Sequence, residues 1–397
     1  MNIGGGDIVQ ANSSAGPTRR AVLAGIAAAG AMPALPALAA DAAPLRFGLA
    51  MPLTGGQATY GQDQVRAAQW GLDAINAAGG VNGRKLEAIT LDTQADPQIG
   101  IQAANRLVSI EKVPVFVTAW SEVVKAVAPV ANDAKAVELS VGANSAQIAK
   151  LGDYVYTTFP LADVDITAVA QYEADKLGKK RAAVLYINNE TGIVAAEIYR
   201  KVFTAAGGTV VAYEAYDPKA TDWTGQILKV RLASPDVIHI QGLVADTPQV
   251  IAQLRQLGMT QTISSYSSIY NPRLIRQLGA AAEGVIATSL APGPADSAAV
   301  AAYVERWKKE VGREPNGLPY TQYLYDAPYI IAAVLRSLAA KSQPVTGESF
   351  RAEMLAIGTF DLPLTGKLVI NADHTVRKPV YLMQVKGGAW TQLAVVG

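Results

Sequence analysis

The apolar positions of this chain form short runs of strand length that alternate with amphipathic segments of helix length. The first run, LRFGLAM at 45–51, leads through a Gly-rich stretch into an amphipathic helical segment that contains Trp70, Leu72 and Ile75. Ala78-Gly79-Gly80 ends that segment, and a second apolar run, KLEAITLD, follows at once. This order predicts a strand, a helix and a second strand.

The same order returns in the second half of the sequence. RAAVLYI at 181–187 is followed by a turn at 188–192, a helical segment to Ala205, Gly207-Gly208 and the strand TVVAYEAYD. We interpret this as an internal repeat of one β-α-β unit, with one copy in each of two lobes. Alternating strands and helices predict the α/β class, with two doubly wound parallel-sheet lobes.

The chain is expected to pass between the lobes several times. A strand at 154–160 leaves the first lobe, a helix at about 165–177 opens the second, and the Pro- and Gly-containing stretch 291–294 returns to the first. Several crossings form a multi-strand hinge, and a hinge over a crevice is a ligand clamp. The predicted boundaries are 44–159 with 291–376 for lobe I, and 160–290 with 377–397 for lobe II.

Further elements follow from local signals. Thr247 before Pro248 and Asn271 before Pro272 each predict an N-cap with proline at the first helical position. Helices are predicted from about 298 to 311 and from 320 to 338. The tail from 367 to 396 alternates as antiparallel strands do.

Two strand-to-helix turns stand close together between Val113 and Gln147. Apolar runs end at Ala119-Trp120-Ser121 and at Ala143-Asn144-Ser145, and each polar turn is suited to cap a following helix. Backbone N–H groups at two such turns would point into one crevice, which is where an open parallel sheet binds small ligands.

Composition narrows the classes of function. The chain has 397 residues, 50% hydrophobic and 17% charged, which is enough for two domains with cores of their own. With 34 basic and 33 acidic residues and no run of Lys and Arg, no nucleic-acid or anionic-membrane surface is expected. The absence of cysteine excludes disulfides, thiolate metal sites, a cysteine nucleophile and a lipid-modified N-terminal cysteine.

The N-terminal residues have the layout of an export signal. Thr18-Arg19-Arg20 precedes an apolar region that ends in Ala37-Leu38-Ala39, which predicts a cleaved signal peptide at 1–39. The paired arginines indicate the twin-arginine route, and the predicted location is the periplasm. The alternative is a single membrane anchor or a core helix, but Pro33 and Pro36 interrupt the run and its length is marginal for a membrane span.

Catalytic motifs are missing from the sequence. There is no GxSxG, HExxH, Walker A lysine or GxGxxG fingerprint, so no enzymatic activity and no cofactor are expected. Gly55-Gly56 with Gly61, followed by a strand that ends at Asp92, imitates a dinucleotide site with the wrong glycine spacing; an exported oxidoreductase is the remote alternative. His239 and His374 are interpreted as structural, because two isolated histidines cannot build a typical zinc site.

A family resemblance covers nearly all of the chain after the signal segment. Its specific residues are PLTGGQATYGQDQVRAAQWGLDAINAAGGVNGRKL, the following LDTQADP, and the run from Lys180 to Gly258 that contains Thr221-Asp222-Trp223. With these residues the chain resembles the periplasmic solute-binding proteins of branched-chain amino acid ABC transporters, of the Leu/Ile/Val-binding type with the type I periplasmic binding fold. The resemblance implies a small-molecule ligand, membrane permease subunits as partners, and a monomer.

The resemblance also implies a set of site residues. Family members hold a ligand carboxylate at the two turns described above, which here correspond to Ser121 and to Ala143, Asn144 and Ser145. An aromatic residue that packs on the ligand corresponds to Tyr60. Two tyrosines and an acidic residue across the cleft correspond to Thr191, Leu243 and Ser267.

These last three positions depart from the amino-acid binders. A buried ammonium without its acidic partner costs roughly 3–5 kcal/mol. Either Glu122 or Asp246 substitutes for the missing acid, or the ligand is not an α-amino acid. Glu122 has a second interpretation, as a solvated carboxylate that complements a helix dipole. Hydrophobic amino acids, amide- or urea-like compounds and aromatic acids therefore all remain candidate ligands.

Aromatic residues offer an apolar wall for such a ligand. Tyr266 and Tyr270, with Tyr60 and Trp120, are predicted to line it. Tyr320, Tyr323, Tyr325 and Tyr329 have roughly helical spacing and are assigned to core and interlobe packing. The expected function is ligand capture by hinge closure for an ABC importer, with ligand sensing for a receptor or regulator as the alternative.

Overall fold

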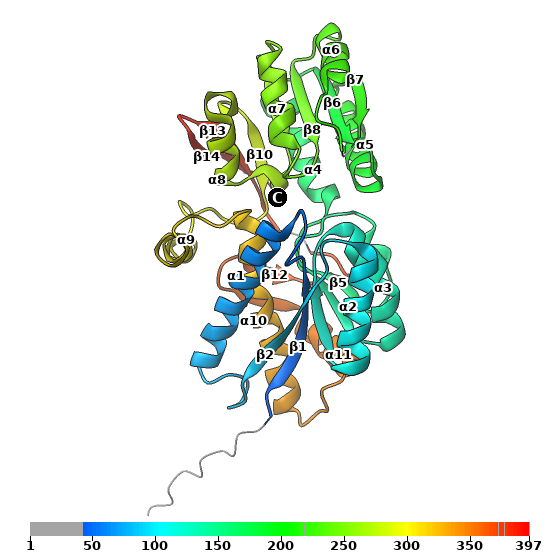
Figure 1. The fold of residues 1–397 in the computed structure, drawn as a ribbon, viewed down its shortest axis with the longest axis vertical. Coiled ribbons are helices and arrows are strands. Elements are labelled where there is room, and N and C mark those ends of the chain that lie inside the picture. The colour runs from blue at the N-terminus through cyan, green and yellow to red at the C-terminus, as the bar shows by residue number, and fades with distance from the viewer. Residues whose placement is uncertain (1–42, 218, 372, 377, 397) are drawn as a thin grey trace, which may run out of the picture. The chain divides into compact units, whose positions relative to one another are not determined.

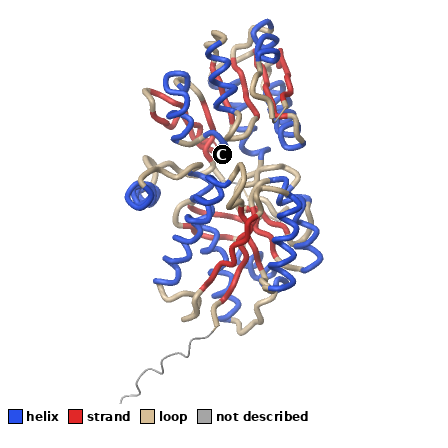
Figure 2. The backbone as a smooth tube through the Cα atoms, in the orientation of Figure 1, coloured by secondary structure: helices blue, strands red, loops and turns tan. Residues whose placement is uncertain are grey.

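A computed structural model describes residues 43–217, 219–371, 373–376 and 378–396. The predicted signal peptide lies outside the described residues. Figure 1 shows the arrangement of helices and strands, and Figure 2 shows that helices lie on both faces of the sheets. The predicted α/β fold is confirmed.

The first sheet has five parallel strands in the order β2-β1-β3-β4-β5. Strands β1, β3, β4 and β5 are largely buried, as expected where helices cover both faces, and the edge strand β2 is mostly half-buried. Strand β2 lies on one side of β1, and β3, β4 and β5 follow one another on the other side. The direction in which successive strands are added therefore changes at β1. The strands are β1 (Leu45–Met51), β2 (Leu86–Asp92), β3 (Val115–Thr118), β4 (Val137–Ser140) and β5 (Val155–Thr157).

Two hydrophobic clusters cover the two faces of this sheet. The larger cluster joins the sheet to α1, α9, α10 and α11, and the smaller one joins it to α2 and α3. Helices α1 and α10 touch so closely that a Cβ at Gly71 would lie 2.1 Å from the backbone oxygen of Tyr325, which explains the glycine. These helices are α1 (Ala58–Ala77), α2 (Pro97–Asn105), α3 (Ser121–Ala134), α9 (Ala298–Val311), α10 (Leu318–Ala340) and α11 (Gly347–Ile357).

The second sheet has seven strands in the order β14-β13-β10-β9-β8-β6-β7. Strands β13 and β14 are antiparallel, which confirms the alternation of the tail, and the others run parallel. The strands are β6 (Arg181–Ile187), β7 (Thr209–Tyr216), β8 (Val237–Gln241), β9 (Thr262–Ser265), β10 (Ile286–Ser289), β13 (Val380–Lys386) and β14 (Ala389–Val396).

Helices also cover both faces of the second sheet. One cluster packs α6, α7 and α8 on one face, and another packs α4 and α5 on the opposite face. The helices are α4 (Ala162–Gln171), α5 (Glu190–Ala205), α6 (Thr224–Leu232), α7 (Thr247–Gln256) and α8 (Pro272–Leu278). A separate hairpin of β11 (Thr359–Leu362) and β12 (Gly366–Val369) follows α11.

Several local predictions need correction. The predicted turn at 188–192 is shorter, because Asn189 caps α5 through a bond from the Gly192 N–H and the helix begins at Glu190. Asp246, not Thr247, precedes the first residue of α7, whereas the Asn271 cap of α8 is confirmed. Helix α11 was not predicted, although Thr346 and Ser349 form a capping box at its start.

Strand β4 buries a carboxyl group, which makes stability depend on pH. Glu138 is fully buried, and its Oε1 accepts a 2.6 Å hydrogen bond from the Thr118 hydroxyl. Burial raises the pKa of Glu138 from 4.5 to about 8, although the Thr118 bond opposes that rise. The unfolded chain therefore loses this proton at lower pH than the folded protein, so the contribution of Glu138 to stability falls as pH rises between about 4.5 and 8.

We expect Glu138→Gln to remove this pH dependence. Relative to the wild type, its free energy of unfolding should rise between pH 5 and pH 9 by at least about 2 kcal/mol, because each pKa unit is worth about 1.4 kcal/mol. Urea unfolding of both proteins across this pH range measures the difference. Parallel stability profiles would show that Glu138 is not the group responsible.

Candidate ligand-binding site

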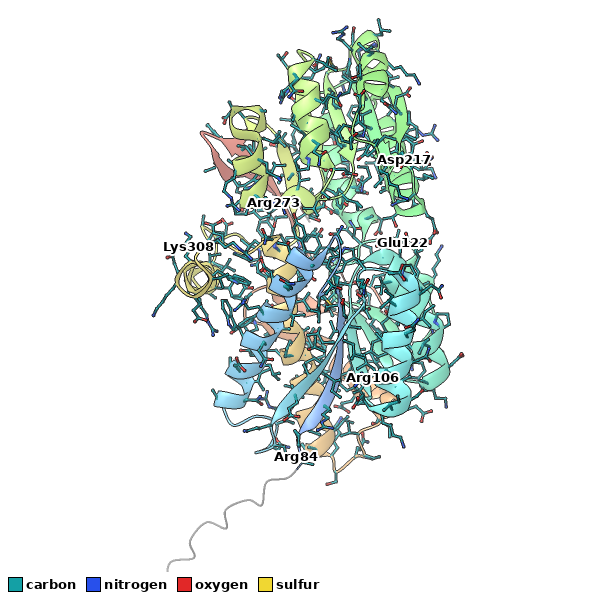
Figure 3. All side chains as sticks on the ribbon, viewed as in Figure 1. Arg84, Arg106, Glu122, Asp217, Arg273 and Lys308 are labelled. Atoms are coloured by element: carbon teal, nitrogen blue, oxygen red, sulfur yellow. The ribbon has the colours of Figure 1, made fainter. Side chains whose placement is uncertain are left out.

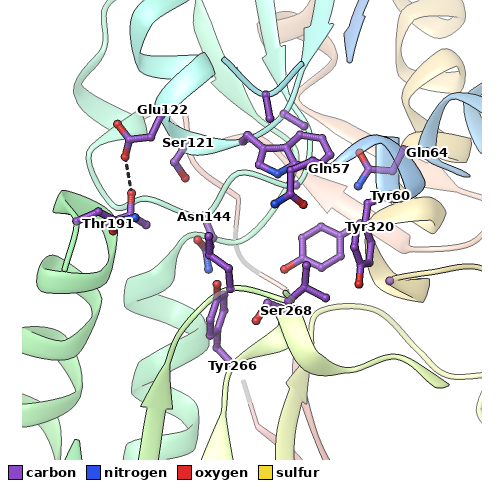
Figure 4. A pocket seen from close by; sticks show the side chains of 18 residues that line it. Gln57, Tyr60, Gln64, Ser121, Glu122, Asn144, Thr191, Tyr266, Ser268 and Tyr320 are labelled. Atoms are coloured by element: carbon purple, nitrogen blue, oxygen red, sulfur yellow. Dashed lines mark hydrogen bonds between the residues drawn. The ribbon is translucent and has the colours of Figure 1, made fainter. Parts of the chain in front are cut away.

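A cavity of about 280 Å³ lies between elements of the two sheets (Figure 4). The elements of the first sheet contribute the start of α1, the turn before α3, the loop after β4 and the start of α10. The second sheet contributes the start of α5 and the loops after β8 and β9. The lining residues are Gln57, Tyr60, Gln64, Ala95, Ala119, Trp120, Ser121, Glu122, Gly142, Asn144, Asn189, Thr191, Leu243, Val244, Tyr266, Ser268, Gly317 and Tyr320.

Aromatic rings from both sheets form much of the wall. Tyr60 and Trp120 come from the first sheet's elements, and Tyr266 follows β9 of the second. Burial raises the pKa of Tyr60, and the guanidinium of Arg273, a residue labelled in Figure 3, partly opposes that rise. Three of the predicted aromatic residues therefore meet at one cavity.

Two other tyrosines are placed differently from the prediction. Tyr270 does not line the cavity; its ring packs against Trp390 with a centroid distance of 5.3 Å. Tyr320 was assigned to packing alone, but it lines the cavity while its ring stacks on Phe159 at 5.0 Å. It stands in the first turn of α10, whose long apolar pattern concealed this role.

The first predicted turn brings Trp120 and Ser121 to the cavity. Trp120 has a φ of +65° and a ψ of 117°, a backbone conformation that residues other than glycine rarely adopt. Ser121 is the first residue of α3, so it does not cap the helix with its side chain as predicted. The first helical bond runs from the Val124 N–H to the Trp120 carbonyl, which leaves the earlier N–H groups of α3 without helical acceptors.

The second turn differs from the first. No α-helix follows Ser145; a short 3₁₀ turn at Ile148–Lys150 takes its place. The Ser145 N–H donates a 3.3 Å bond to the Ser121 hydroxyl oxygen, so the two turns are joined to each other. Asn144 lines the cavity, whereas Ala143 and Ser145 are buried and do not line it.

Glutamines from the first Gly-rich loop and α1 were missed by the sequence reasoning. Gln64 is only 5% exposed, and its Oε1 has no hydrogen-bond partner among the described residues. Gln57 and Gln64 stand three residues before and four residues after Tyr60, and such positions share one face of a helix. Because Tyr60 was predicted to contact the ligand, this spacing could have identified both glutamines as candidate site residues. Asn189 and Ser268 line the cavity as well and were not predicted.

Ser267 stands at the position where the amino-acid binders have an acidic residue, and it is bonded to a buried carboxylate. Ser267 is fully buried and does not line the cavity; its hydroxyl donates a 2.9 Å bond to Asp165 Oδ2. Thr288 also donates to Asp165, and Tyr320 lies 3.3 Å from the Ser267 hydroxyl. Burial raises the pKa of Asp165 to about 6 against the opposing effect of these hydrogen bonds. A carboxyl group is thus present behind Ser267, but it serves the protein itself.

The two candidate charge partners are both occupied. Glu122 accepts a 3.0 Å bond from the Thr191 hydroxyl and lies 3.1 Å from Lys125 Nζ. Asp246 does not line the cavity; it accepts bonds from the Leu243 N–H at 2.7 Å and from the Thr247 hydroxyl at 3.2 Å. Leu243 and Thr191 do line the cavity.

An ion pair joins the two sheets' elements beside the cavity. Lys125 of α3 donates a 2.7 Å bond to Glu190, the first residue of α5. Burial opposes the charge of Lys125, but bonds to Glu190 and Glu122 outweigh it and raise the pKa of Lys125. The bond from Thr191 to Glu122 lies between the same two helices, so the start of α5 is held to the start of α3.

The two histidines have structural partners. His239 is buried, stacks on Tyr199 at 4.1 Å and contacts the Ser264 hydroxyl. His374 stacks on Tyr156 at 4.2 Å. Within the described part of the chain, no group of three or more His, Cys, Asp or Glu residues is placed to hold a metal ion. Among the same residues, no helix combines the length and the apolar character needed to cross a membrane.

The sequence matches a known protein family and several curated relatives. The family model described as periplasmic binding protein matches residues 44–389. An amino acid binding protein of Pseudomonas aeruginosa is 26% identical over 307 residues, which cover 76% of this chain and 81% of the relative. A Leu/Ile/Val-binding protein homolog 1 of Brucella suis is 25% identical over 366 residues, covering 92% and 95%.

Solved structures share the fold. LivJ, a branched-chain amino acid transporter substrate binding protein from Streptococcus pneumoniae in complex with isoleucine, has a TM-score of 0.80 at 21% identity, covering 89% of this chain and 99% of that one. A solute binding protein of an ABC transporter from Rhodopseudomonas palustris, in complex with 3,4-dihydroxy benzoic acid, has a TM-score of 0.78 at 22% identity, covering 89% and 97%. The family match spans most of the chain. This protein therefore belongs to the periplasmic binding protein family and has the type I fold that its sequence predicted.

Proposed function

We propose that this protein is the substrate-binding component of an ABC importer, which captures a small polar or amphipathic solute and delivers it to a membrane permease. The observation that supports this most is the cavity between the two sheets, with aromatic walls and polar groups from both sides. Relatives are named as amino acid binding proteins, and structural neighbours hold isoleucine or aromatic acids. Cavities of this type orient small ligands by a few polar contacts.

The proposed mechanism is capture by hinge closure. Lobe I comprises residues 44–159 and 291–376, and lobe II comprises 160–290 and 377–397. Ligand binds first to the turns at Ser121 and Asn144, and Thr191 and Leu243 then close over it. The ligand stabilises the closed form by its higher affinity for that form. The protein acts as a monomer in the periplasm, after removal of a twin-arginine signal peptide at 1–39, and is not an enzyme.

A thermal-shift panel combined with small-angle X-ray scattering tests this proposal. A panel of amino acids, amides, urea and organic acids should contain a compound that stabilises the protein, by about 2.7 kcal/mol at 100 times its dissociation constant. That compound should also reduce the radius of gyration. A scattering curve that does not change at saturating ligand would contradict hinge closure.

The ion pair beside the cavity gives a prediction about closure. We expect Lys125→Glu to weaken ligand binding about five- to tenfold, because it places a third carboxylate beside Glu122 and Glu190. Calorimetric titration at low ionic strength measures the loss, which salt should reduce. The control is Lys135→Glu at the other end of α3, which replaces an exposed ion pair with Glu348 by two carboxylates away from the cavity lining. Equal affinities in both variants would argue against a role of Lys125 in closure.

A further inference from the structure

The cavity has an unusual balance of charge. Among the described residues that line it, Glu122 is the only one with a carboxylate, and none carries an ammonium or guanidinium group. Glu122 already receives bonds from Thr191 and Lys125. The one carboxylate among these lining residues is therefore already paired with the Lys125 ammonium, which leaves little net charge to attract a positively charged ligand.

The neighbouring carboxyl groups, of Asp165 and Asp246, also accept hydrogen bonds from the protein itself. Asp165 receives bonds from Ser267 and Thr288, and Asp246 receives them from Leu243 and Thr247. Neither residue lines the cavity. A ligand ammonium enclosed here would lack a charged partner, which weakens binding at least about 100-fold relative to the same ligand without that group.

The cavity does offer free hydrogen-bond donors, which suit a negatively charged ligand group. Asn144 is 8% exposed, and its Nδ2 has no partner among the described residues. The Ser121 hydroxyl oxygen accepts from the Ser145 N–H, so its own proton is available to a ligand. Ser121 is the first residue of α3, a 14-residue helix whose positive end favours an anion. Asn144 stands in the loop after β4, and the N–H of the next residue, Ser145, bonds to the Ser121 hydroxyl. These groups together suit a carboxylate.

The remaining wall suits a planar ring with a polar group at its far end. Figure 4 shows Ser121 on one side of the cavity and Gln64 with Tyr60 on the other. Gln64 is 5% exposed, and its amide oxygen Oε1 also has no hydrogen-bond partner among the described residues. An amide can present either its oxygen or its nitrogen after a half turn, so Gln64 can pair with a ring hydroxyl.

We propose that the cavity selects small aromatic carboxylates that lack an ammonium group, with the carboxylate at Ser121 and Asn144 and a ring hydroxyl at Gln64. This inference rests on the proposed solute-binding function and narrows its ligand class. Lys125 compensates the charge of Glu122, and thereby reduces its repulsion of an anionic ligand.

Matched ligands test the inference by calorimetric titration of the whole protein. The probes are 4-hydroxybenzoate, benzoate, 4-hydroxybenzamide, L-tyrosine and L-leucine. We expect 4-hydroxybenzoate to bind at least tenfold more tightly than benzoate or 4-hydroxybenzamide, and at least 100-fold more tightly than either amino acid.

The outcomes separate this inference from the proposed function. Tight binding of L-leucine or L-tyrosine would overturn the inference and keep the solute-binding function. Equal affinity for 4-hydroxybenzoate and its amide would overturn the assignment of a carboxylate site. If neither these probes nor the broader thermal-shift panel binds, both the inference and the proposed function fail.

A single substitution tests where the carboxylate lies. Asn144→Asp places a negative charge at that point, so 4-hydroxybenzoate should bind at least tenfold more weakly while the affinity for 4-hydroxybenzamide is kept or raised. General damage to the cavity would weaken both ligands alike, and that result would contradict the proposal. The control is Asn105→Asp on the exposed face of α2, which adds the same charge away from the cavity and should leave both affinities unchanged.

Discussion

Replacement of Trp120 by glycine should weaken ligand binding at least 100-fold, which corresponds to about 2.7 kcal/mol. The indole lines the cavity and packs between the hydrophobic clusters on the two faces of the first sheet. A large aromatic side chain provides most of the contact area that a small ring can bury, and its loss leaves a gap that water fills. Calorimetric titration with the compound that stabilises the wild type measures the effect.

The backbone at Trp120 adds a second expectation, on stability. Its φ of +65° with a ψ of 117° is unfavourable for any residue with a Cβ, and strain of this kind is found at functional sites. Glycine tolerates this conformation, whereas alanine does not. Without ligand, Trp120→Gly should therefore unfold with a free energy about 1 kcal/mol higher than Trp120→Ala, although both lose the indole.

The pair of variants separates contact from strain. Both should bind ligand poorly, since both lack the ring, and only their stabilities should differ. A glycine variant less stable than the alanine variant would mean that the surrounding loop relaxes freely and stores no strain at this position. Retained affinity in both would place the ligand away from Trp120.

Asp63→Ala should destabilise the protein by about 2–5 kcal/mol, because it leaves the two buried donor groups of Asn316 without their acceptor and the partly exposed Arg313 without its counter-ion. Asp63 is 3% exposed and forms two 2.7 Å bonds with the Arg313 guanidinium. It also accepts bonds from the backbone and side-chain nitrogens of Asn316, at 2.8 and 2.9 Å. One carboxylate thus fixes the connection between α9 and α10.

This connection also positions part of the cavity. Gly317 and Tyr320 follow it directly and line the wall, so Asp63→Ala should weaken ligand binding as well as stability. Urea unfolding and titration of the same samples measure both effects. The control is Asp73→Ala on α1, whose carboxylate is exposed and bonds only to the nearby Gln69 in the described structure; it should cost less than about 0.5 kcal/mol. A loss of similar size in both variants would contradict the role given to Asp63.

The regular elements were predictable because their signals are local. Strand β6 at 181–187 and the end of α5 at Ala205 follow directly from hydrophobic spacing and from the glycines after them. The prediction of a helix after the second turn was wrong, because Ala143-Asn144-Ser145 resembles a helix start in its local sequence but only a 3₁₀ turn follows. Helix α11 was missed because a short amphipathic segment in a polar tail has a weak pattern.

Residues at the cavity were predictable only in part. Tyr60, Trp120, Ser121, Asn144, Thr191, Leu243 and Tyr266 were proposed from the sequence and its resemblance to a family, and all line the cavity. Ligand contact by these residues stays a prediction. Ala143, Ser145, Ser267 and Asp246 were proposed as well but lie outside the lining, because their neighbours in space consume their polar groups or cover them.

By itself, the sequence determined the α/β class, the repeated β-α-β unit and the crevice at the carboxyl ends of the strands, since spacing and turn residues specify these locally. The tertiary structure alone decided which polar groups remain free for a ligand. Asp165 and Ser267 are 102 residues apart and pair in the interior, while Lys125 and Glu190 meet across 65 residues. Such pairings depend on how distant segments pack, and no local pattern records them. The charge of the cavity, and with it the proposed ligand class, therefore follows from the tertiary structure.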